Sequence, residues 1–220
     1  MMKEGNYHVG FAFDGDADRL IAVDEDGNLI DGDHTMYICG CYMHEKGILH
    51  DDVVVTTVMS NLGLYHALTA KGIKYEQTAV GDKYVFECMR EHGYSVGGEQ
   101  SGHIIFNEHE NTGDGLMTAL KLLEIMVNTK KSLKELSEDL FIYPQLLINT
   151  PVKDKHKAME DPELLKVVDE VARELGDEGR ILVRPSGTEP LVRVMVEAKT
   201  DELCEQYVNQ VIDFINAKGL

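Results

Sequence analysis

The stretch VVVTTVMSNLGLYHALTAKGIKYEQTAV, residues 53–80, decides the fold class of this 220-residue chain. Its first six residues are mostly β-branched, which predicts a buried strand. Ser60 can cap a helix over residues 61–71, and Gly72 is of the residue type that commonly ends helices. Residues 73–80 then predict a second strand. A helix between two such strands indicates an α/β domain.

The alternation of strands and helices continues on both sides of this stretch. The expected elements are helices over residues 33–47, 83–92 and 116 onward, and short strands over 94–96 and 103–106. In the last of these helices Leu116, Leu120, Leu123 and Val127 recur at helical spacing, so we expect them to share one face. We therefore assign residues 31–143 to a mixed-sheet α/β domain.

A different order of elements begins after residues 141–144, which we interpret as a linker. The expected order is β-α-β-β-α, over residues 146–152, 162–175, 181–183, 191–198 and 201 onward. Asp161-Pro162 is a strong helix start. This order predicts a smaller two-layer α+β C-terminal domain over residues 144–220. Residues 1–30 hold too few strands for a sheet of their own, so we expect them to end a domain whose body lies upstream.

The formal net charge is −18, with 39 acidic against 21 basic residues. Such a chain repels phosphate backbones and anionic lipid, so we expect neither a nucleic-acid nor a membrane partner. No apolar run approaches the roughly 20 residues that span a bilayer, and the N-terminus lacks the apolar stretch of a signal peptide. We therefore expect a cytoplasmic protein. The one C-x-C pair, Cys39 and Cys41, has no matching second pair, so reduced thiols are favoured over a zinc site.

Three aspartates at alternate positions follow an apolar run, in the segment Asp14-Gly15-Asp16-Ala17-Asp18-Arg19. Like charges so close repel one another, and a hard cation relieves that repulsion. Mg²⁺ prefers oxygen ligands. We therefore predict a Mg²⁺ site with Asp14, Asp16 and Asp18 as ligands, with a solvated acidic turn as the alternative.

Two other metal motifs fit this segment less well. An EF-hand calcium loop would use Asp14, Asp16, Asp18 and Glu25, but Arg19 stands where that loop needs glycine, and the flanks predict strands rather than helices. Haloacid-dehalogenase phosphatases also begin with a strand followed by Asp-x-Asp. Their fifth position is usually Thr or Val, whereas here it is Asp18.

A second loop, residues 97–103, places several polar groups between glycines. Glu99 offers a carboxylate, Gln100 an amide, Ser101 a hydroxyl and His103 an imidazole. Sugar hydroxyls and amines need directional donors and acceptors of this kind. The segment is therefore a candidate sugar site, with a polar surface turn as the alternative.

A third loop joins two predicted strands at residues 184–190. Its candidate anion-binding residues are Arg184, Ser186, Gly187 and Thr188. Arginine can hold a phosphate with two parallel hydrogen bonds, and glycine lets backbone N–H groups approach an anion. Arg193 lies on the next strand, on the face opposite three valines, and could reach back toward the loop. We predict phosphate binding here, with a plain strand connection as the alternative.

Together the three loops, in this order and at about this spacing, resemble those of the α-D-phosphohexomutase superfamily. The subtype resembles the phosphoglucosamine mutases, on the Glu-Gln-Ser-Gly-His form of the second loop and on residues 58–61, 80–85, 112–115 and 184–190. The resemblance covers nearly the whole chain. It implies an intact enzyme of four domains, of which this chain would hold the end of the second (1–30), the third (31–143) and the fourth (144–220).

The resemblance also implies a reaction, the interconversion of glucosamine 6-phosphate and glucosamine 1-phosphate through glucosamine 1,6-bisphosphate. A phosphoserine in a Ser-His-Asn-Pro type motif would donate the phosphate, and Mg²⁺ would neutralise the transferring group. No such motif occurs in the chain. We therefore expect a hexosamine phosphate substrate, a chain that is inactive alone, and the N-terminal half of the same enzyme as its partner.

By matching position, the resemblance implies a role for each candidate residue. Asp14, Asp16 and Asp18 would bind the metal, and Arg19, the catalytic residue that this chain retains, would lie near the transferring phosphate. The sugar would be held by Glu99, Gln100, Ser101 and His103. The distal phosphate would be held by Arg184, Ser186, Gly187, Thr188 and Arg193.

Two positions depart from the subfamily pattern, and two other functions stay open. Ala17 stands where glycine is usual, and Lys83 where arginine is commoner.

One alternative function is that of a phosphomannomutase or phosphoglucomutase, against which Gln100 is a modest cue. The other is a non-catalytic module that binds a sugar phosphate.

Overall fold

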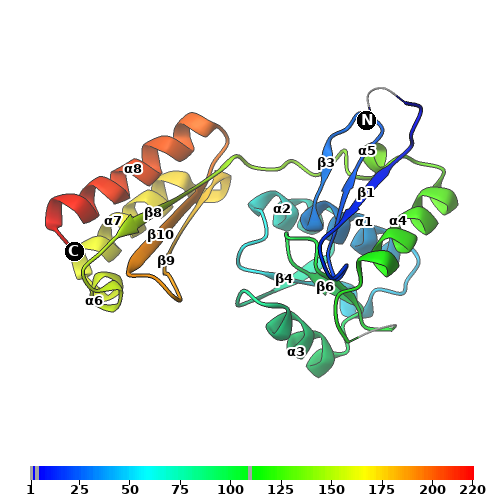
Figure 1. Ribbon diagram of the computed structural model, residues 1–220, viewed down its shortest axis with the longest axis horizontal. Coiled ribbons are helices and arrows are strands. Elements are labelled where there is room, and N and C mark those ends of the chain that lie inside the picture. Colours follow the sequence, from blue (N-terminus) through cyan, green and yellow to red (C-terminus); the bar gives the residue numbers. More distant parts are fainter. Residues whose placement is uncertain (1, 3–4, 109–110) are drawn as a thin grey trace. The chain divides into compact units, whose positions relative to one another are not determined.

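The computed structural model describes residue 2, residues 5–108 and residues 111–220. These residues form two compact units, the first ending at Phe141 and the second running over Ile142–Leu220 (Figure 1). The first unit combines a mixed sheet with helices, and the second is a smaller assembly of one antiparallel sheet and helices. The fold class predicted from the sequence is confirmed.

The described residues of the first unit form two sheets and five α-helices. One sheet is antiparallel, with the order β1-β2-β3, and consists of β1 (Gly10–Phe13), β2 (Leu20–Val23) and β3 (Leu29–Ile30). The expectation that residues 1–30 hold too few strands for a sheet of their own was wrong, because the turn after Asp24 returns the chain beside β2 as a third strand. The other sheet has the order β5-β4-β6-β7, and consists of β4 (Val53–Thr57), β5 (Lys74–Thr78), β6 (Val96–Gly98) and β7 (Ile104–Phe106). β4 is parallel to β5 and β6, whereas β7 is antiparallel to β6. The helices are α1 (Gly32–Glu45), α2 (Leu62–Ala70), α3 (Asp82–His92), α4 (Gly115–Thr129) and α5 (Leu133–Leu136), with a 3-10 turn at His50–Asp52.

Strand β4 is central in its sheet, and all of its residues are buried. Val53 and Val55 pack against Met89 of α3. On the opposite face α1 comes so close at Gly40 that a Cβ there would lie 2.8 Å from a methyl carbon of Val54. Helices therefore cover both faces, which explains why the strand is a continuous run of β-branched residues rather than an alternating one.

Helix α4 carries apolar side chains on two faces. Leu116, Leu120, Leu123 and Val127 are all exposed, and Val127 is 74% exposed. The buried residues of the helix are Gly115, Thr118, Ala119, Leu122 and Ile125. The apolar face that the leucine spacing indicated is thus the outer one, while a face built partly from small residues packs toward α1 and β2.

The second unit has three strands in the order β8-β10-β9, all antiparallel. They are β8 (Gln145–Pro151), β9 (Arg180–Pro185) and β10 (Leu191–Glu197). The helices are α6 (Lys155–Glu160), α7 (Pro162–Leu175) and α8 (Asp201–Lys218), with a 3-10 turn at Gly176–Glu178. The Asp161 side chain accepts hydrogen bonds from the N–H groups of Glu163 and Leu164, as the predicted cap of α7 requires. Helix α6 was not expected from the sequence.

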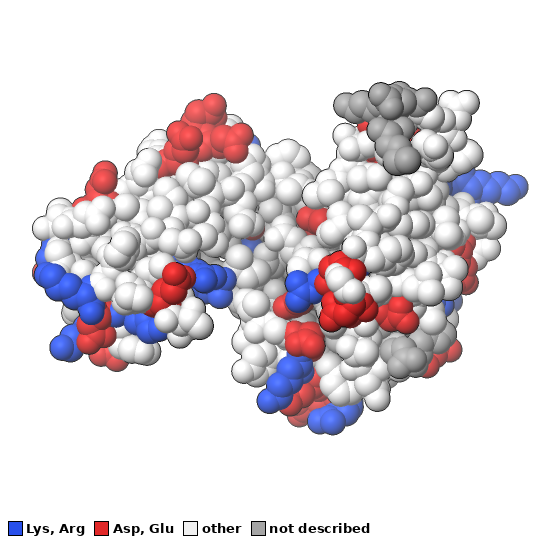
Figure 2. Space-filling view, viewed as in Figure 1, with Lys and Arg blue, Asp and Glu red and all other residues white. Residues whose placement is uncertain are grey.

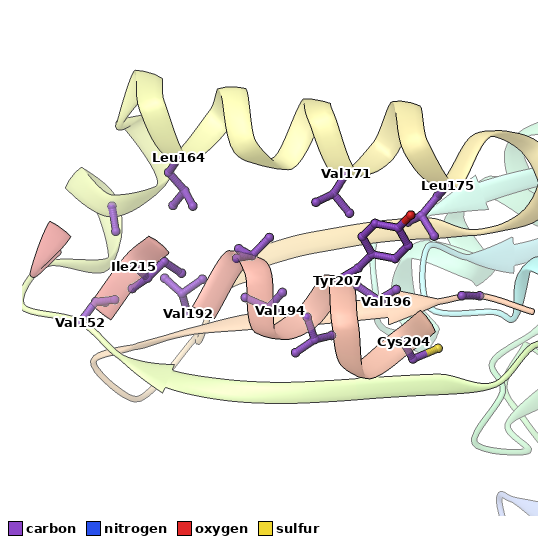
Figure 3. Packing of buried hydrophobic residues seen from close by; sticks show 14 residues of the cluster. Val152, Leu164, Val171, Leu175, Val192, Val194, Val196, Cys204, Tyr207 and Ile215 are labelled. Atoms are coloured by element: carbon purple, nitrogen blue, oxygen red, sulfur yellow. The ribbon is translucent and has the colours of Figure 1, made fainter. Parts of the chain in front are cut away.

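Figure 3 shows the core of this unit, where side chains of α7 and α8 meet those of the sheet. Val192, Val194 and Val196 of β10 are fully buried there. Because successive side chains of a strand alternate between faces, Arg193 lies on the other face of the sheet. The antiparallel register places it directly opposite Arg184 of β9.

Within the described residues, none of the helices combines the length and apolar character needed to cross a bilayer. Acidic side chains form several groups on the face shown in Figure 2, and the lysines and arginines of that face lie between them rather than in one continuous basic area.

Candidate functional site

The loop between β1 and β2 brings the three aspartates together. One carboxylate oxygen from each of Asp14, Asp16 and Asp18 lies within 4.8 Å of the other two. Asp14 and Asp16 are exposed, and Asp18 is half-buried. Three negative charges at this separation form an all-oxygen donor set, which fits a hard divalent cation such as Mg²⁺. Metal binding itself stays a prediction.

The turn of this loop depends on Ala17, which has φ of +61°. Its N–H donates to the Asp14 carbonyl oxygen at 3.3 Å. A side chain in this left-handed region costs about 1–2 kcal/mol relative to glycine, so alanine takes up here the conformation that glycine adopts freely. Arg19 follows the turn, half-exposed, with its Nε 3.9 Å from an Asp14 carboxylate oxygen.

The polar loop at residues 99–103 is fixed to neighbouring elements through its backbone. The Leu20 N–H donates to the Gly102 carbonyl at 3.1 Å, and the Gly32 N–H donates to the Gln100 carbonyl at 3.0 Å. The Glu99 carboxylate accepts the Gly81 N–H at 3.0 Å. The loop therefore lies against β2, directly after the aspartate loop, and its Glu99 reaches the segment before α3.

His103 joins the polar loop to the aspartate loop. His103 is 2% exposed, and its Nδ1 lies 3.0 Å from Asp18 Oδ2. The other ring nitrogen, Nε2, accepts the Gly113 N–H at 2.9 Å. A nitrogen that accepts carries no proton, so the proton of the neutral ring is on Nδ1 and is donated to Asp18. Both ring nitrogens are thus engaged within the chain, and the sugar contact expected of His103 stays a prediction.

The start of α4 is a further part of this site that sequence reasoning assigned no role. The Gly115 N–H donates to the Ala17 carbonyl at 2.9 Å. A Cβ on Gly115 would lie 2.8 Å from the carbonyl oxygens of Ala17 and Arg19, so only glycine fits there without displacement. The glycines at positions 113 and 115 were the sequence signal that could have indicated this close approach.

Lys83, one of the two positions that depart from the subfamily pattern, is exposed on α3, with its ammonium 3.8 Å from the Glu87 carboxylate.

The predicted anion-binding residues all belong to the second unit. Arg184 and Arg193 are cross-strand neighbours. Burial, and secondarily the charge of Arg193, lower the pKa of the Arg184 guanidinium. The Arg193 Nε is buried and has no hydrogen-bond partner among the described residues. Two adjacent cations with such an unpaired donor favour an anionic ligand.

The loop beside them is held by its own hydrogen bonds and by one lysine. The Ser186 N–H donates to the Leu191 carbonyl at 2.9 Å, and Ser186 Oγ accepts the Glu189 N–H at 3.3 Å. Gly187 has open space around the position of a Cβ. Lys155 of α6 donates to carbonyl oxygens of this loop, a contact that no sequence pattern indicated.

The four cysteines are free, and the two in the C-x-C pair differ in exposure. Burial raises the pKa of the Cys39 thiol to about 12 and that of Cys41 to about 11. Both thiols are therefore protonated at neutral pH, a state in which they are poor metal ligands.

Comparison with known families identifies the class of protein. The family described as phosphoglucomutase/phosphomannomutase, alpha/beta/alpha domain III, matches residues 31–143, and the C-terminal domain of the same family matches residues 147–214. The chain belongs to the phosphoglucomutase/phosphomannomutase family, as the resemblance of its three loops implied.

Among curated proteins, the chain is similar to phosphoglucosamine mutases. It is 58% identical to the one from Lachnoclostridium phytofermentans over 216 residues, which is 98% of this chain and 48% of that protein. It is 55% identical to the one from Bacillus subtilis over 217 residues, 99% of this chain and 48% of that protein. The chain thus spans about half the length of these relatives.

Solved structures show the same fold. A phosphoglucomutase/phosphomannomutase family protein from Burkholderia thailandensis matches with a TM-score of 0.80 and 27% identity, over 98% of this chain and 48% of that one. The Aspergillus fumigatus N-acetylphosphoglucosamine mutase in complex with GlcNAc-6P and magnesium matches with a TM-score of 0.77 and 22% identity, over 96% of this chain and 49% of that one.

Proposed function

We propose that this chain is part of a cytoplasmic phosphoglucosamine mutase, which interconverts glucosamine 6-phosphate and glucosamine 1-phosphate. The observation that carries the proposal is the joined pair of loops in the first unit. Three converging carboxylates and a loop of sugar-type hydrogen-bonding groups are tied together by the His103 bridge to Asp18. The similarity to phosphoglucosamine mutases over nearly the whole chain supports the choice of sugar.

In this proposal the chain binds the metal, the sugar and the distal phosphate, and the phosphoryl donor lies elsewhere in the enzyme. A phosphoserine outside these 220 residues donates its phosphate to the substrate, forming glucosamine 1,6-bisphosphate, and then receives back the other phosphate. Because the intermediate must bind in both orientations, the sugar and distal-phosphate contacts have to tolerate either end. The chain alone is expected to be inactive, and residues 1–30, 31–143 and 144–220 would belong to three successive domains of the intact enzyme.

The proposed roles follow the positions of the side chains. Asp14, Asp16 and Asp18 would hold Mg²⁺, which when bound neutralises charge on the transferring phosphate. Arg19, half-exposed beside Asp14, would face that phosphate. The sugar hydroxyls and amine would be bound by Glu99, Gln100, Ser101 and His103, and His103 would also hold Asp18 in place. The distal phosphate would be bound by Arg184, Ser186, Gly187, Thr188 and Arg193.

Calorimetric titration of this chain, in the presence of Mg²⁺, tests the sugar-phosphate assignment. We expect saturable binding that prefers glucosamine 6-phosphate to glucose 6-phosphate. Replacing Arg184 with alanine removes a bidentate phosphate donor and should weaken binding at least about tenfold. Arg173→Ala is the matched control, because Arg173 is exposed on α7 and its loss changes the net charge equally. Equal affinities of the two variants would contradict the phosphate role, and a preference for glucose 6-phosphate would favour a phosphoglucomutase.

Titration with Mg²⁺ alone tests the carboxylate cluster. Asp16→Asn keeps the size of the side chain but removes one of three ligand charges, so Mg²⁺ affinity should fall about tenfold or more. Asp26→Asn is the control, because Asp26 is an exposed acid that pairs with Lys134 at another turn of the first unit. Competition with Mn²⁺ followed by electron paramagnetic resonance gives both affinities. If the Asp16→Asn chain held the ion as tightly as the Asp26→Asn chain, the cluster would not be the metal site.

A further inference from the structure

The ammonium group of Lys155 is surrounded by carbonyl oxygens of the Arg184–Pro190 loop. Its Nζ donates to the Ser186 carbonyl at 2.5 Å, to the Gly187 carbonyl at 3.2 Å and to the Glu189 carbonyl at 3.5 Å. Lys155 is half-buried at the first position of α6. A lysine ammonium has three N–H donors, and three carbonyls accept from it here. Its donors are therefore used within the chain and are not left for a ligand.

Because a peptide group is planar, the direction of each carbonyl that Lys155 binds also fixes the direction of the N–H group in the same peptide. In a trans peptide the C=O and the N–H point in opposite directions, and none of the described peptide bonds is cis. The carbonyl of Ser186 shares a peptide with the N–H of Gly187, and the carbonyl of Gly187 shares one with the N–H of Thr188. Because both carbonyls are directed at Lys155, both N–H groups are directed away from it.

The two N–H groups are available on that outer side. Within residues 2, 5–108 and 111–220, neither the Gly187 nor the Thr188 N–H donates a hydrogen bond. Apart from Gly187 itself and its two chain neighbours, no described residue has an atom within 4 Å of the place that a Cβ on Gly187 would occupy. Both residues are exposed. Successive free N–H groups in a loop are an established means of binding an anion.

We infer that Lys155 is a positioning residue of the anion site, which turns the Ser186–Gly187 and Gly187–Thr188 peptide groups so that their N–H groups face the bound phosphate. The inference rests on the proposed phosphate role of this loop and deepens it. Lys155 acts through carbonyl oxygens and does not touch the phosphate. Without it the two carbonyls lose their partner, and the peptides can rotate so that oxygen rather than N–H faces the anion.

The test is a titration of the ¹⁵N-labelled chain with inorganic phosphate, followed through the amide signals of Gly187 and Thr188. In the unaltered chain phosphate should shift both signals downfield. Lys155→Met keeps the aliphatic stem but removes the donors, and should weaken phosphate binding roughly tenfold and abolish the two shifts. Lys155→Arg retains charge and donors and should restore part of the response. Lys157→Met is the matched control, since Lys157 lies on the same helix with an exposed side chain and should change the affinity less than about twofold.

The variants separate failure of this inference from failure of the phosphate assignment. If the unaltered chain and Arg184→Ala both leave the two amides unshifted, the phosphate role of the loop is wrong and the inference falls with it. Suppose that the unaltered chain binds phosphate and Arg184→Ala does not. If Lys155→Met then binds phosphate as tightly as Lys157→Met and shows the same amide shifts, only the role of Lys155 is overturned. Dispersed amide signals of the second unit show that each variant is folded. Should Lys155→Met unfold, Lys155→Gln takes its place, with a loss of both shifts supporting the inference and normal shifts overturning it.

Discussion

Replacing Gly102 with alanine is expected to lower the free energy of unfolding of the first unit by about 3 kcal/mol. Gly102 has φ of +92°, in the region that disfavours side chains, and a Cβ there would lie 2.2 Å from the Leu20 carbonyl oxygen. That oxygen belongs to β2 backbone, which cannot move aside without breaking the hydrogen bond from the Leu20 N–H to the Gly102 carbonyl. The backbone strain at residue 102 and the steric overlap with Leu20 therefore both destabilise the contact between the polar loop and β2.

Gly47→Ala is the control for this prediction, because Gly47 has φ of +67° but open space around the position of its Cβ. It should cost only the conformational strain, about 1 kcal/mol. Urea unfolding followed by amide signals of the first unit measures both variants. Equal losses would mean that the close approach to Leu20 is relieved at little cost. A weaker Mg²⁺ affinity in the Gly102→Ala chain alone would show that the two loops depend on each other.

The parts that the sequence predicted well are those set by neighbours along the chain. The strand-helix-strand order of β4, α2 and β5 follows from β-branched runs with a helical segment between them, all within 30 residues. The predicted cap at Ser60 was wrong by one residue, because Asn61 is the N-cap of α2 and its side chain accepts the Gly63 N–H. The convergence of Asp14, Asp16 and Asp18 is equally local, since they alternate in one short loop. Such features need no knowledge of what packs against them.

Features that depend on distant contacts could not be predicted in the same way. Helix α4 has two apolar faces, and the leucine-rich one that spacing emphasised is exposed, because the side packed on α1 and β2 favours small residues. His103 meets an aspartate 85 positions away, and Lys155 meets carbonyls 31 and 32 positions away. The sequence shows which loops carry polar groups, but only the tertiary fold determines which partner each one faces.

The second large effect is expected at the ion pair between Arg180 and Glu197, which are cross-strand neighbours on β9 and β10. Hydrogen bonds join them, among them one from Arg180 Nε at 2.7 Å and one from a terminal guanidinium nitrogen at 3.1 Å. Glu197 is 0% exposed and the Arg180 side chain is 20% exposed. Arg180→Met would remove this cation from a buried carboxylate, and should lower the free energy of unfolding of the second unit by about 3–5 kcal/mol.

A second variant distinguishes loss of the partner from loss of packing. In the Arg180→Met, Glu197→Gln chain no buried charge is left without a cation, so most of the lost stability should return. Lys199→Met serves as the control, because Lys199 and its partner Glu178 are both more than half-exposed, and its loss should cost less than about 1 kcal/mol. Urea unfolding gives the free energy of unfolding of all three variants and distinguishes the two explanations. Similar losses for Arg180→Met and Lys199→Met would show that water reaches Glu197, whereas a double variant as unstable as Arg180→Met would assign the loss to packing of the arginine stem rather than to charge.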